Sequence, residues 1–286
     1  MTVAATSTAL IPPHVELLRP WGRWGLRITA ITYLLLVIVA PLSAVLANGF
    51  GSGIAAFVRD VTSPVALSAL KLTIIVAVVT TLINAVMGTL TAYALVRYDF
   101  PGRSLLNGIV DLPFAIPTLV TGVMLVVLYG PQRMIGQWLT THGIEVIFAP
   151  PGIVLAMLFV TYPFVVRTVQ PVLHGAEIRQ EEAAFSLGAG KWTAFRRILL
   201  PTLTPALVSG CLLTFARALG EFGSVVIVAG NIPNLTLTAP VHIYGQIESQ
   251  NQQGASAMSS VLLALSFVLM LVIDTMQARK VVDRGE

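Results

Sequence analysis

Apolar stretches long enough to cross a lipid bilayer recur along the whole of this sequence. A transmembrane helix needs about 20 consecutive and mostly apolar residues, and in this chain of 286 residues 56% are hydrophobic while only 10% are charged. Helices satisfy their own backbone hydrogen bonds inside lipid, so such a chain folds as a bundle of membrane helices. We therefore predict an all-α membrane protein with six transmembrane helices, at residues 26–47, 68–96, 105–129, 152–173, 203–229 and 258–277.

The first apolar stretch follows Arg19, Arg23 and Arg27 and superficially resembles a secretory signal. It is as long as a full span and further spans follow it, so we expect an uncleaved first helix. Later spans contain prolines, among them Pro113 and Pro117 in the third. Such residues are tolerated in membrane helices when neighbouring groups satisfy the freed backbone. They fit kinked helices around a transport pathway and equally fit simple packing kinks.

Lys and Arg residues gather in alternate connections between the predicted spans. The connections on the opposite side offer only Arg59 and Arg133. Because Lys and Arg are enriched in cytoplasmic loops, both termini and the long loop at 174–201 are predicted to be cytoplasmic. The same asymmetry explains the net charge of +4, so that charge does not indicate a nucleic-acid partner. The residues on the predicted cytoplasmic side are Arg19, Arg23, Arg27, Arg97, Arg103, Arg167, Arg179, Lys191, Arg196, Arg197, Arg279, Lys280 and Arg284.

Few residues of this chain offer catalytic or metal-binding chemistry. The single cysteine, Cys211, lies in an apolar run and cannot form an intramolecular disulfide or a Cys-based metal site. The histidines are dispersed, and each is expected to be a solvated surface residue. The run GAGKW lacks the first glycine and the Ser or Thr of a phosphate-binding loop. We therefore expect no enzyme, cofactor or metal site in this chain. The histidines are His14, His142, His174 and His242.

The stretch EEAAFSLGAG, which starts at Glu181, interrupts the apolar pattern with acids, alanines and glycines. Glu177, Glu181 and Glu182 stand where the N-terminus of a helix favours negative charge, and Gly188 supplies a helix stop. The following KWTAFRRILL is predicted as a second helix that ends against Pro201. A helix, a glycine turn and a second helix would present a compact knob on which another protein can dock.

The same loop resembles the EAA signature of the membrane subunits of bacterial ABC importers, and every defined position matches. The matching residues are Glu182, Ala183, Ala184, Gly188, Ile198, Leu200 and Pro201. In that family the segment forms a coupling helix, which docks into a groove of the cytoplasmic ATPase. The resemblance implies that Glu182, Ala183, Ala184 and Gly188 are the ATPase-coupling residues.

Three further stretches resemble the sulfate/thiosulfate importer permeases. They are LVRYDFPGRSLLNGIVDLPFAIPT (95–118), FVVRTVQPVL (164–173) and RALGEFGSVVIVAGNIP (217–233). Together they look most like the T-type subunit of that transporter, over residues 65–277. The DLPF and LGEFG elements also recur in the related molybdate permeases, so the alternative is a molybdate or other oxyanion ABC permease. The segment after Pro233 departs from the T-type pattern and is expected to be an outward-facing loop that meets a binding protein.

The resemblance implies a permease subunit of the type I ABC importer fold that translocates sulfate, and thiosulfate with it, across a bacterial inner membrane. It also implies the partners: a related W-type permease, two copies of a cytoplasmic ATPase that binds ATP and magnesium, an extracytoplasmic sulfate-binding protein and the lipid bilayer. A secondary transporter would instead carry acids over several spans. The expected segments are a cytoplasmic N-terminus (1–25), the first helix with its outer loop (26–64), the importer domain (65–277) and a cytoplasmic tail (278–286).

Polar residues near the spans could line a path for an oxyanion. Hydroxyls, backbone N–H groups and helix N-termini can hold a tetrahedral dianion without full neutralisation. The candidates for this role are Thr118, Thr121, Ser224 and Asn231. Asp111 is predicted to have a different role, because an unneutralised acid would repel sulfate. It is expected either to cap a broken helix or to pair with a basic neighbour.

Arg217 and Glu221 are two ionisable residues within the fifth predicted span. Four residues apart, they are expected to lie on one helical face and to pair, since an unpaired charge in a membrane is costly. In a functional interpretation Arg217 contacts the anion or a gate, while Glu221 is its counter-ion or a conformational latch. In a structural interpretation the pair is simply buried between subunits.

Overall fold

The computed structural model describes residues 20–175 and 178–282, and every regular element among them is a helix. The chain divides into two compact units, Met1–Ala47 and Asn48–Glu286. In the first unit, α1 (Pro20–Leu34), the π-turn η1 (Leu35–Val39) and most of α2 (Ala40–Gly49) follow one another along the chain. Together they form a stretch long and apolar enough to cross a membrane. The uncleaved first helix expected at 26–47 is thus helical throughout.

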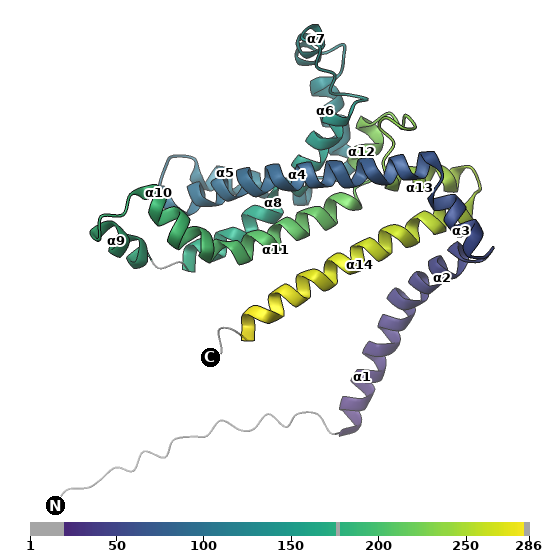
Figure 1. Cartoon of the computed structure of the whole chain (residues 1–286), viewed down its shortest axis with the longest axis horizontal. Helices are drawn as coiled ribbons and strands as arrows, with labels where there is room; N and C mark the ends of the chain where they lie inside the picture. Colours follow the sequence, from purple (N-terminus) through teal and green to yellow (C-terminus); the bar gives the residue numbers. More distant parts are fainter. Residues whose placement is uncertain (1–19, 176–177, 283–286) are drawn as a thin grey trace, which may run out of the picture. The chain divides into compact units, whose positions relative to one another are not determined.

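The second unit is built around three helices, α4 (Pro64–Arg97), α8 (Pro150–Gly175) and α11 (Leu200–Leu219), which lie side by side (Figure 1). Close approach depends on small residues, because a Cβ atom at Gly88 would lie 2.9 Å from the Cβ of Val165. A buried hydrogen bond of 2.9 Å from Asn84 Nδ2 to Thr161 Oγ1 also joins α4 to α8. The apolar core at one end of these helices contains Leu95, Val165, Val169, Leu173 and Leu203.

The third predicted span, 105–129, is not one helix. It consists of α5 (Arg103–Ala115) and α6 (Thr118–Tyr129), whose axes differ by 113°. Ile116 is extended in front of Pro117, as a residue before proline prefers, and the proline ring cannot continue the hydrogen-bond ladder. Pro113, in contrast, lies inside α5. The prediction of a kinked but continuous helix was therefore wrong at Pro117.

The fifth predicted span, 203–229, differs at both ends. α11 ends at Leu219, and a short α12 (Gly223–Val228) follows after a break. At the other end α10 (Lys191–Ala194) continues through the π-turn η2 (Phe195–Leu199) into α11, so that Lys191–Leu219 is one long helix of 29 residues. The predicted helix end at Pro201 was wrong. The N–H of Leu200 bonds to the carbonyl of Phe195, five residues earlier, and this π-type turn directly before the proline accommodates it within the helix.

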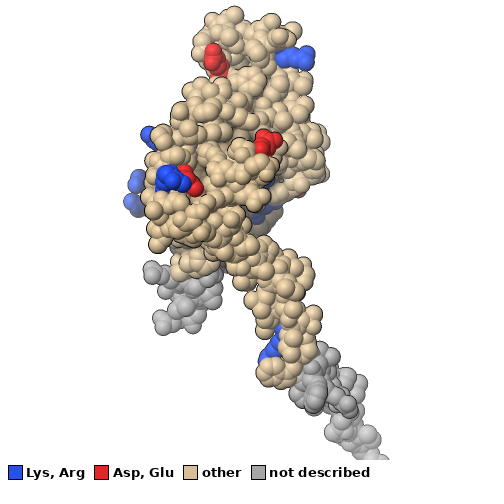
Figure 2. All heavy atoms as spheres, turned by 90° about the vertical axis from the view of Figure 1, so that its right-hand side faces the viewer, with Lys and Arg blue, Asp and Glu red and all other residues tan. Residues whose placement is uncertain are grey.

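Shorter helices occupy the connections between the long ones, and of these only the helix before Gly188 was predicted from the sequence. They are α3 (Ile54–Val61), α7 (Met134–Thr141), α9 (Ile178–Ser186) and α13 (Ala239–Glu248), and the last long helix is α14 (Gln252–Val282). The segment after Pro233, predicted as an outward-facing loop, contains α13, whose first N–H group, at Ala239, donates to Thr73 Oγ1 of α4 over 2.8 Å. Figure 2 looks at the end of the molecule that carries α3 and α13, and only a few Lys, Arg, Asp and Glu side chains are visible there.

Candidate coupling loop and transport pathway

Helix α9 ends in a Schellman motif centred on Gly188. The N–H of Gly188 donates to the Phe185 carbonyl and the N–H of Ala189 donates to the Ala184 carbonyl, both over 2.9 Å. Gly188 has a φ of +84°, the left-handed conformation that this motif requires. A Cβ atom at this position would meet nothing within 4 Å, so backbone conformation rather than space demands glycine. The predicted helix stop at Gly188 is confirmed.

The tip of this loop is apolar and exposed. Leu187 is 89% exposed and Phe185 is 44% exposed. Glu182, Ala183 and Gly188 are exposed as well, and Ala184 is half-buried. Exposed large apolar residues beside small ones are typical of a surface on which a protein docks. The predicted acid Glu177 lies outside the described residues, as does the side chain of Glu181.

Arg217 and Glu221 form the ion pair that the sequence predicts, but not on one helical face. Nη2 of Arg217 lies 2.7 Å from Oε2 of Glu221, while Glu221 stands in the break after α11 and is 1% exposed. The other carboxylate oxygen of Glu221 accepts hydrogen bonds from the backbone N–H and the hydroxyl of Ser224, each over 2.9 Å. Glu221 therefore joins the last turn of α11 to the first turn of α12.

The two helix breaks meet where α6 packs on α12. A Cβ atom at Gly223 would collide with Thr118 Oγ1, and a Cβ atom at Gly122 would lie 2.8 Å from the Ser224 carbonyl oxygen. Thr118 and Ser224, predicted as pathway residues, are thus brought together. Thr121 is buried on α6. Its hydroxyl has no hydrogen-bond partner in the described part of the chain.

Two further predictions for this region have different outcomes. Asn231 is exposed, with a φ of +54°, in the turn after α12. Asp111 pairs with a basic neighbour, which is one of its two predicted roles. That neighbour is Arg167: its Nε donates to Asp111 Oδ1 over 2.7 Å, and its Nη2 forms the ion pair with Oδ2.

From the sequence, Arg167 is counted among the residues on the cytoplasmic side, within the predicted span 152–173, and in the structure Arg167 lies within α8. Its guanidinium also donates to the side-chain oxygen of Asn107 over 2.8 Å and to the Asn107 carbonyl over 2.9 Å. Gln170 completes the cluster by accepting from Arg167. A fixed, forked guanidinium can satisfy several acceptors at once, so this cluster fastens α5 to α8.

His242 corrects the prediction that every histidine is solvated. It lies in α13 and is 8% exposed, and burial lowers the pKa of its imidazole below 6.5. Arg59, Asp60 and Gln246 line the same small pocket. Among residues 20–175 and 178–282, no three His, Cys, Asp or Glu side chains are grouped so that they could hold a metal ion.

Comparison with known proteins agrees with this architecture. The chain is 47% identical over 255 residues to the probable sulfate transport system permease protein cysT of Nephroselmis olivacea, covering 89% of each protein. It is 42% identical over 251 residues to the sulfate transport system permease protein CysT of Escherichia coli, covering 88% of this chain and 91% of that protein. The predicted resemblance to sulfate importer permeases is confirmed.

A solved structure shows the same fold. A chain of the bacterial alginate ABC transporter, crystallised with an alginate pentasaccharide-bound periplasmic protein, superposes with a TM-score of 0.75 at 18% identity, over 91% of this chain and 94% of that chain. The type I ABC importer permease fold predicted from the sequence is therefore confirmed. The family described as binding-protein-dependent transport system inner membrane component matches residues 84–282. The chain thus belongs to the family of binding-protein-dependent transport system inner membrane components.

Proposed function

We propose that this chain is the permease subunit of an ATP-driven importer that carries sulfate, and thiosulfate with it, into the cytoplasm. One observation carries the mechanical part of the proposal: the long helix Lys191–Leu219 connects the exposed α9 turn directly to the break that holds Glu221. At a rise of about 1.5 Å per residue, its 29 residues span roughly 43 Å. A displacement at α9 would thus reach the pathway through one continuous element.

The orientation and the partners follow from the same proposal. Both termini and α9 face the cytoplasm, where Lys and Arg residues gather. Two copies of an ATPase subunit supply hydrolysis and bind ATP and magnesium, one of them against Glu182, Ala183, Ala184 and Gly188. A W-type permease completes the membrane part, and an extracytoplasmic binding protein delivers the anion. This chain makes and breaks no bonds itself.

Sulfate would pass between the two permeases near Arg217, Ser224, Thr118 and Thr121. In the described conformation the carboxylate of Glu221 already forms an ion pair with Arg217 and accepts hydrogen bonds from the backbone N–H and the hydroxyl of Ser224. A dianion arriving there would meet like charge, which is unfavourable in a site of low dielectric. We therefore assign Glu221 the role of a latch, which holds the break closed until movement of the long helix Lys191–Leu219 separates it from Ser224.

Alternating access is then a population shift. ATP and the loaded binding protein must both bind the outward-open state more tightly than the resting one, because a ligand with equal affinity for both states shifts nothing. The substrate preference rests on the relatives named as sulfate permeases. Molybdate is the competing oxyanion, since related permeases share the DLPF and LGEFG elements.

Uptake of radiolabelled sulfate tests this function. A host without its own sulfate permease would express the chain with its ATPase, partner permease and binding protein, and excess thiosulfate or molybdate would serve as competitor. We expect ATP-dependent uptake that thiosulfate suppresses and molybdate leaves nearly unchanged. Absence of sulfate uptake by an assembled complex, or strong molybdate uptake instead, would refute the assigned substrate.

A further inference from the structure

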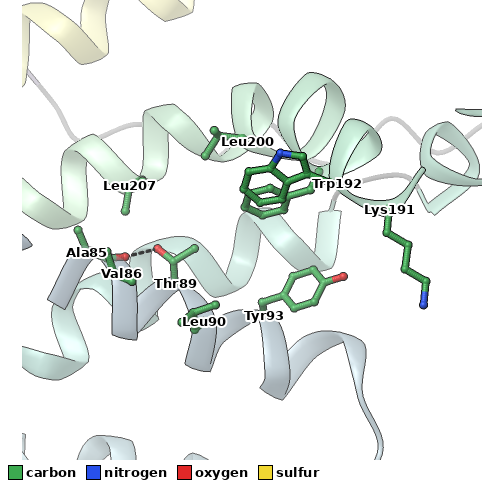
Figure 3. A pocket seen from close by; sticks show the side chains of 10 residues that line it. Ala85, Val86, Thr89, Leu90, Tyr93, Lys191, Trp192, Leu200 and Leu207 are labelled. Atoms are coloured by element: carbon green, nitrogen blue, oxygen red, sulfur yellow. Dashed lines mark hydrogen bonds between the residues drawn. The ribbon is translucent and has the colours of Figure 1, made fainter. Parts of the chain in front are cut away.

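An apolar groove of about 620 Å³ lies between α4 and the long helix Lys191–Leu219. Figure 3 shows the side chains that line it, with Ala85 and Leu207 at one end and Tyr93 and Lys191 at the other. The ring of Trp192 stands over the space between the helices and is 70% exposed. It stacks on Phe195 at a centroid distance of 5.5 Å. The remaining lining residues are Val86, Thr89, Leu90 and Leu200.

The groove has the polarity of an amphiphile. One end and the floor carry aliphatic side chains, and the hydroxyl of Thr89 is turned away to the Ala85 carbonyl of its own helix. The other end carries an ammonium group, an indole and a phenol. Trp and Tyr are enriched at the level of lipid headgroups, and a Lys near a helix end extends toward the same level. Along α4 the lining residues extend from Ala85 to Tyr93, which corresponds to about 12 Å of depth.

We propose that this groove binds an anionic phospholipid, with an acyl chain along Val86, Leu90 and Leu207 and the phosphate at Lys191. The groove opens on the membrane-exposed side of α4, where Val86 is 60% exposed and Leu90 is 58% exposed. Arg196 and Arg197 are exposed on the next turn of the long helix. A lysine at one end of an apolar groove, with two exposed arginines on the next turn of the same helix, favours a negatively charged headgroup over a zwitterionic one.

The position of the groove gives the lipid a consequence for coupling. Lys191 is only three residues beyond Gly188, so the headgroup would sit at the root of the α9 turn. The acyl chain would lie against both α4 and the helix that carries movement to Glu221. This inference rests on the proposed cytoplasmic orientation of α9, because the inner leaflet is the anionic one.

Lipid retention by the purified transporter tests the proposal. The complex, as it co-purifies with this chain, would be placed in nanodiscs of equal phosphatidylglycerol and phosphatidylcholine, and its bound lipids would be counted by native mass spectrometry. We expect the wild type to retain phosphatidylglycerol preferentially. Lys191→Gln should lower the ratio of the two retained lipids about fivefold, the factor that corresponds to one basic residue near an anionic surface. Lys71→Gln, which removes an exposed lysine from the same α4, should leave the ratio unchanged.

A second variant tests the acyl chain. Val86→Phe fills the groove and should remove one retained lipid, whereas Val78→Phe adds the same ring at another exposed position of α4 and should not. An unchanged ratio in Lys191→Gln would overturn the proposal. So would an efficient cross-link from Val86→Cys to another permease subunit, because a protein would then cover the groove. Retention is measured without transport, so a failed sulfate assay leaves this result interpretable.

Discussion

Oε2 of Glu221 lies 2.7 Å from Nη2 of Arg217, while the carboxylate is 1% exposed and the guanidinium side chain is 35% exposed. The acid is therefore buried in the break between α11 and α12, and the base reaches partly toward its surroundings. A buried carboxylate is stable only when it is paired and hydrogen-bonded. Ser224 supplies the hydrogen bonds here. The pair thus has both a structural task and a position from which it can control the break.

Glu221→Gln separates these two tasks. The amide oxygen can still accept from Ser224, but the charge that holds Arg217 is lost, so the free energy of unfolding should fall by roughly 1–3 kcal/mol. If Glu221 is a latch, the assembled transporter should also hydrolyse ATP faster without sulfate. Thermal unfolding in detergent and basal ATPase rate would be measured together.

Asp99→Asn is the matched control for that variant. Asp99 pairs with Arg103, but its side chain is 93% exposed, so its loss should cost only about 0–1 kcal/mol. If the Glu221→Gln transporter is less stable but is normally coupled and takes up sulfate normally, the pair has only a structural role and Glu221 is not a latch.

Gly188→Ala should weaken coupling through the backbone. With a φ of +84° and open space around it, an alanine would strain the turn without any clash. The cost of about 1–2 kcal/mol would lower the population of the native turn roughly 5- to 30-fold. Sulfate uptake should fall accordingly, and Gly188→Asn should fall less, because Asn tolerates this conformation.

Gly190→Ala provides the comparison for Gly188. It is equally open to added side chains, but its φ is −72°, which any residue adopts. Uptake should stay at the wild-type level. Equal loss of uptake in the two alanine variants would show that the conformation of Gly188 is not what matters.

The turn at Gly188 could be predicted because its signals are local. A glycine after an alanine-rich helix determines a Schellman turn within six residues, and no distant contact is needed. The positions of the two helix breaks could not be predicted in the same way. Pro117 breaks its helix while Pro113 does not, and no proline stands at the break near Glu221. Neighbouring helices determine where backbone groups can lose their helical hydrogen bonds and find other partners.

The cluster at Arg167 illustrates the same limit. Asp111 was expected either to cap a helix or to pair, but its partner is 56 residues away in sequence. Gln170 is three residues from Arg167 on α8, but only the packing of α5 on α8 brings Asn107 to the same guanidinium. Charge counting used Arg167 only as a topology signal, because it treats a Lys or Arg near the end of a span in that way, and so it did not reveal this cluster.

Gly223→Ala should disturb the crossing of α6 and α12. The added Cβ would collide with Thr118 Oγ1, and overpacking of this kind costs about 1–3 kcal/mol. A lower unfolding temperature and lower sulfate uptake are expected. Gly108→Ala in α5, which meets nothing within 4 Å, should not lower stability, because alanine is favoured over glycine inside a helix. Adding Thr118→Ala to Gly223→Ala should restore stability, whereas adding Thr118→Ser should not, since the hydroxyl remains. Failure of Thr118→Ala to restore stability would argue against this contact.

Because His242 is buried, we expect the free energy of unfolding to fall in mild acid. Burial lowers the pKa of its imidazole below the ordinary 6.5, so between that lowered pKa and 6.5 the unfolded chain binds a proton that the folded chain does not. The free energy of unfolding therefore rises with pH through this window. The stability that the neutral imidazole contributes is fully present above 6.5 and is lost as the pH falls through the lowered pKa. Arg59, in the same pocket, would add to the effect by repelling an imidazolium, whereas Asp60 would oppose it. Thermal unfolding of the wild type and of His242→Gln between pH 5 and 8 checks this: the glutamine variant should show a flatter dependence on pH, and parallel curves for the two proteins would assign the acid sensitivity to other groups.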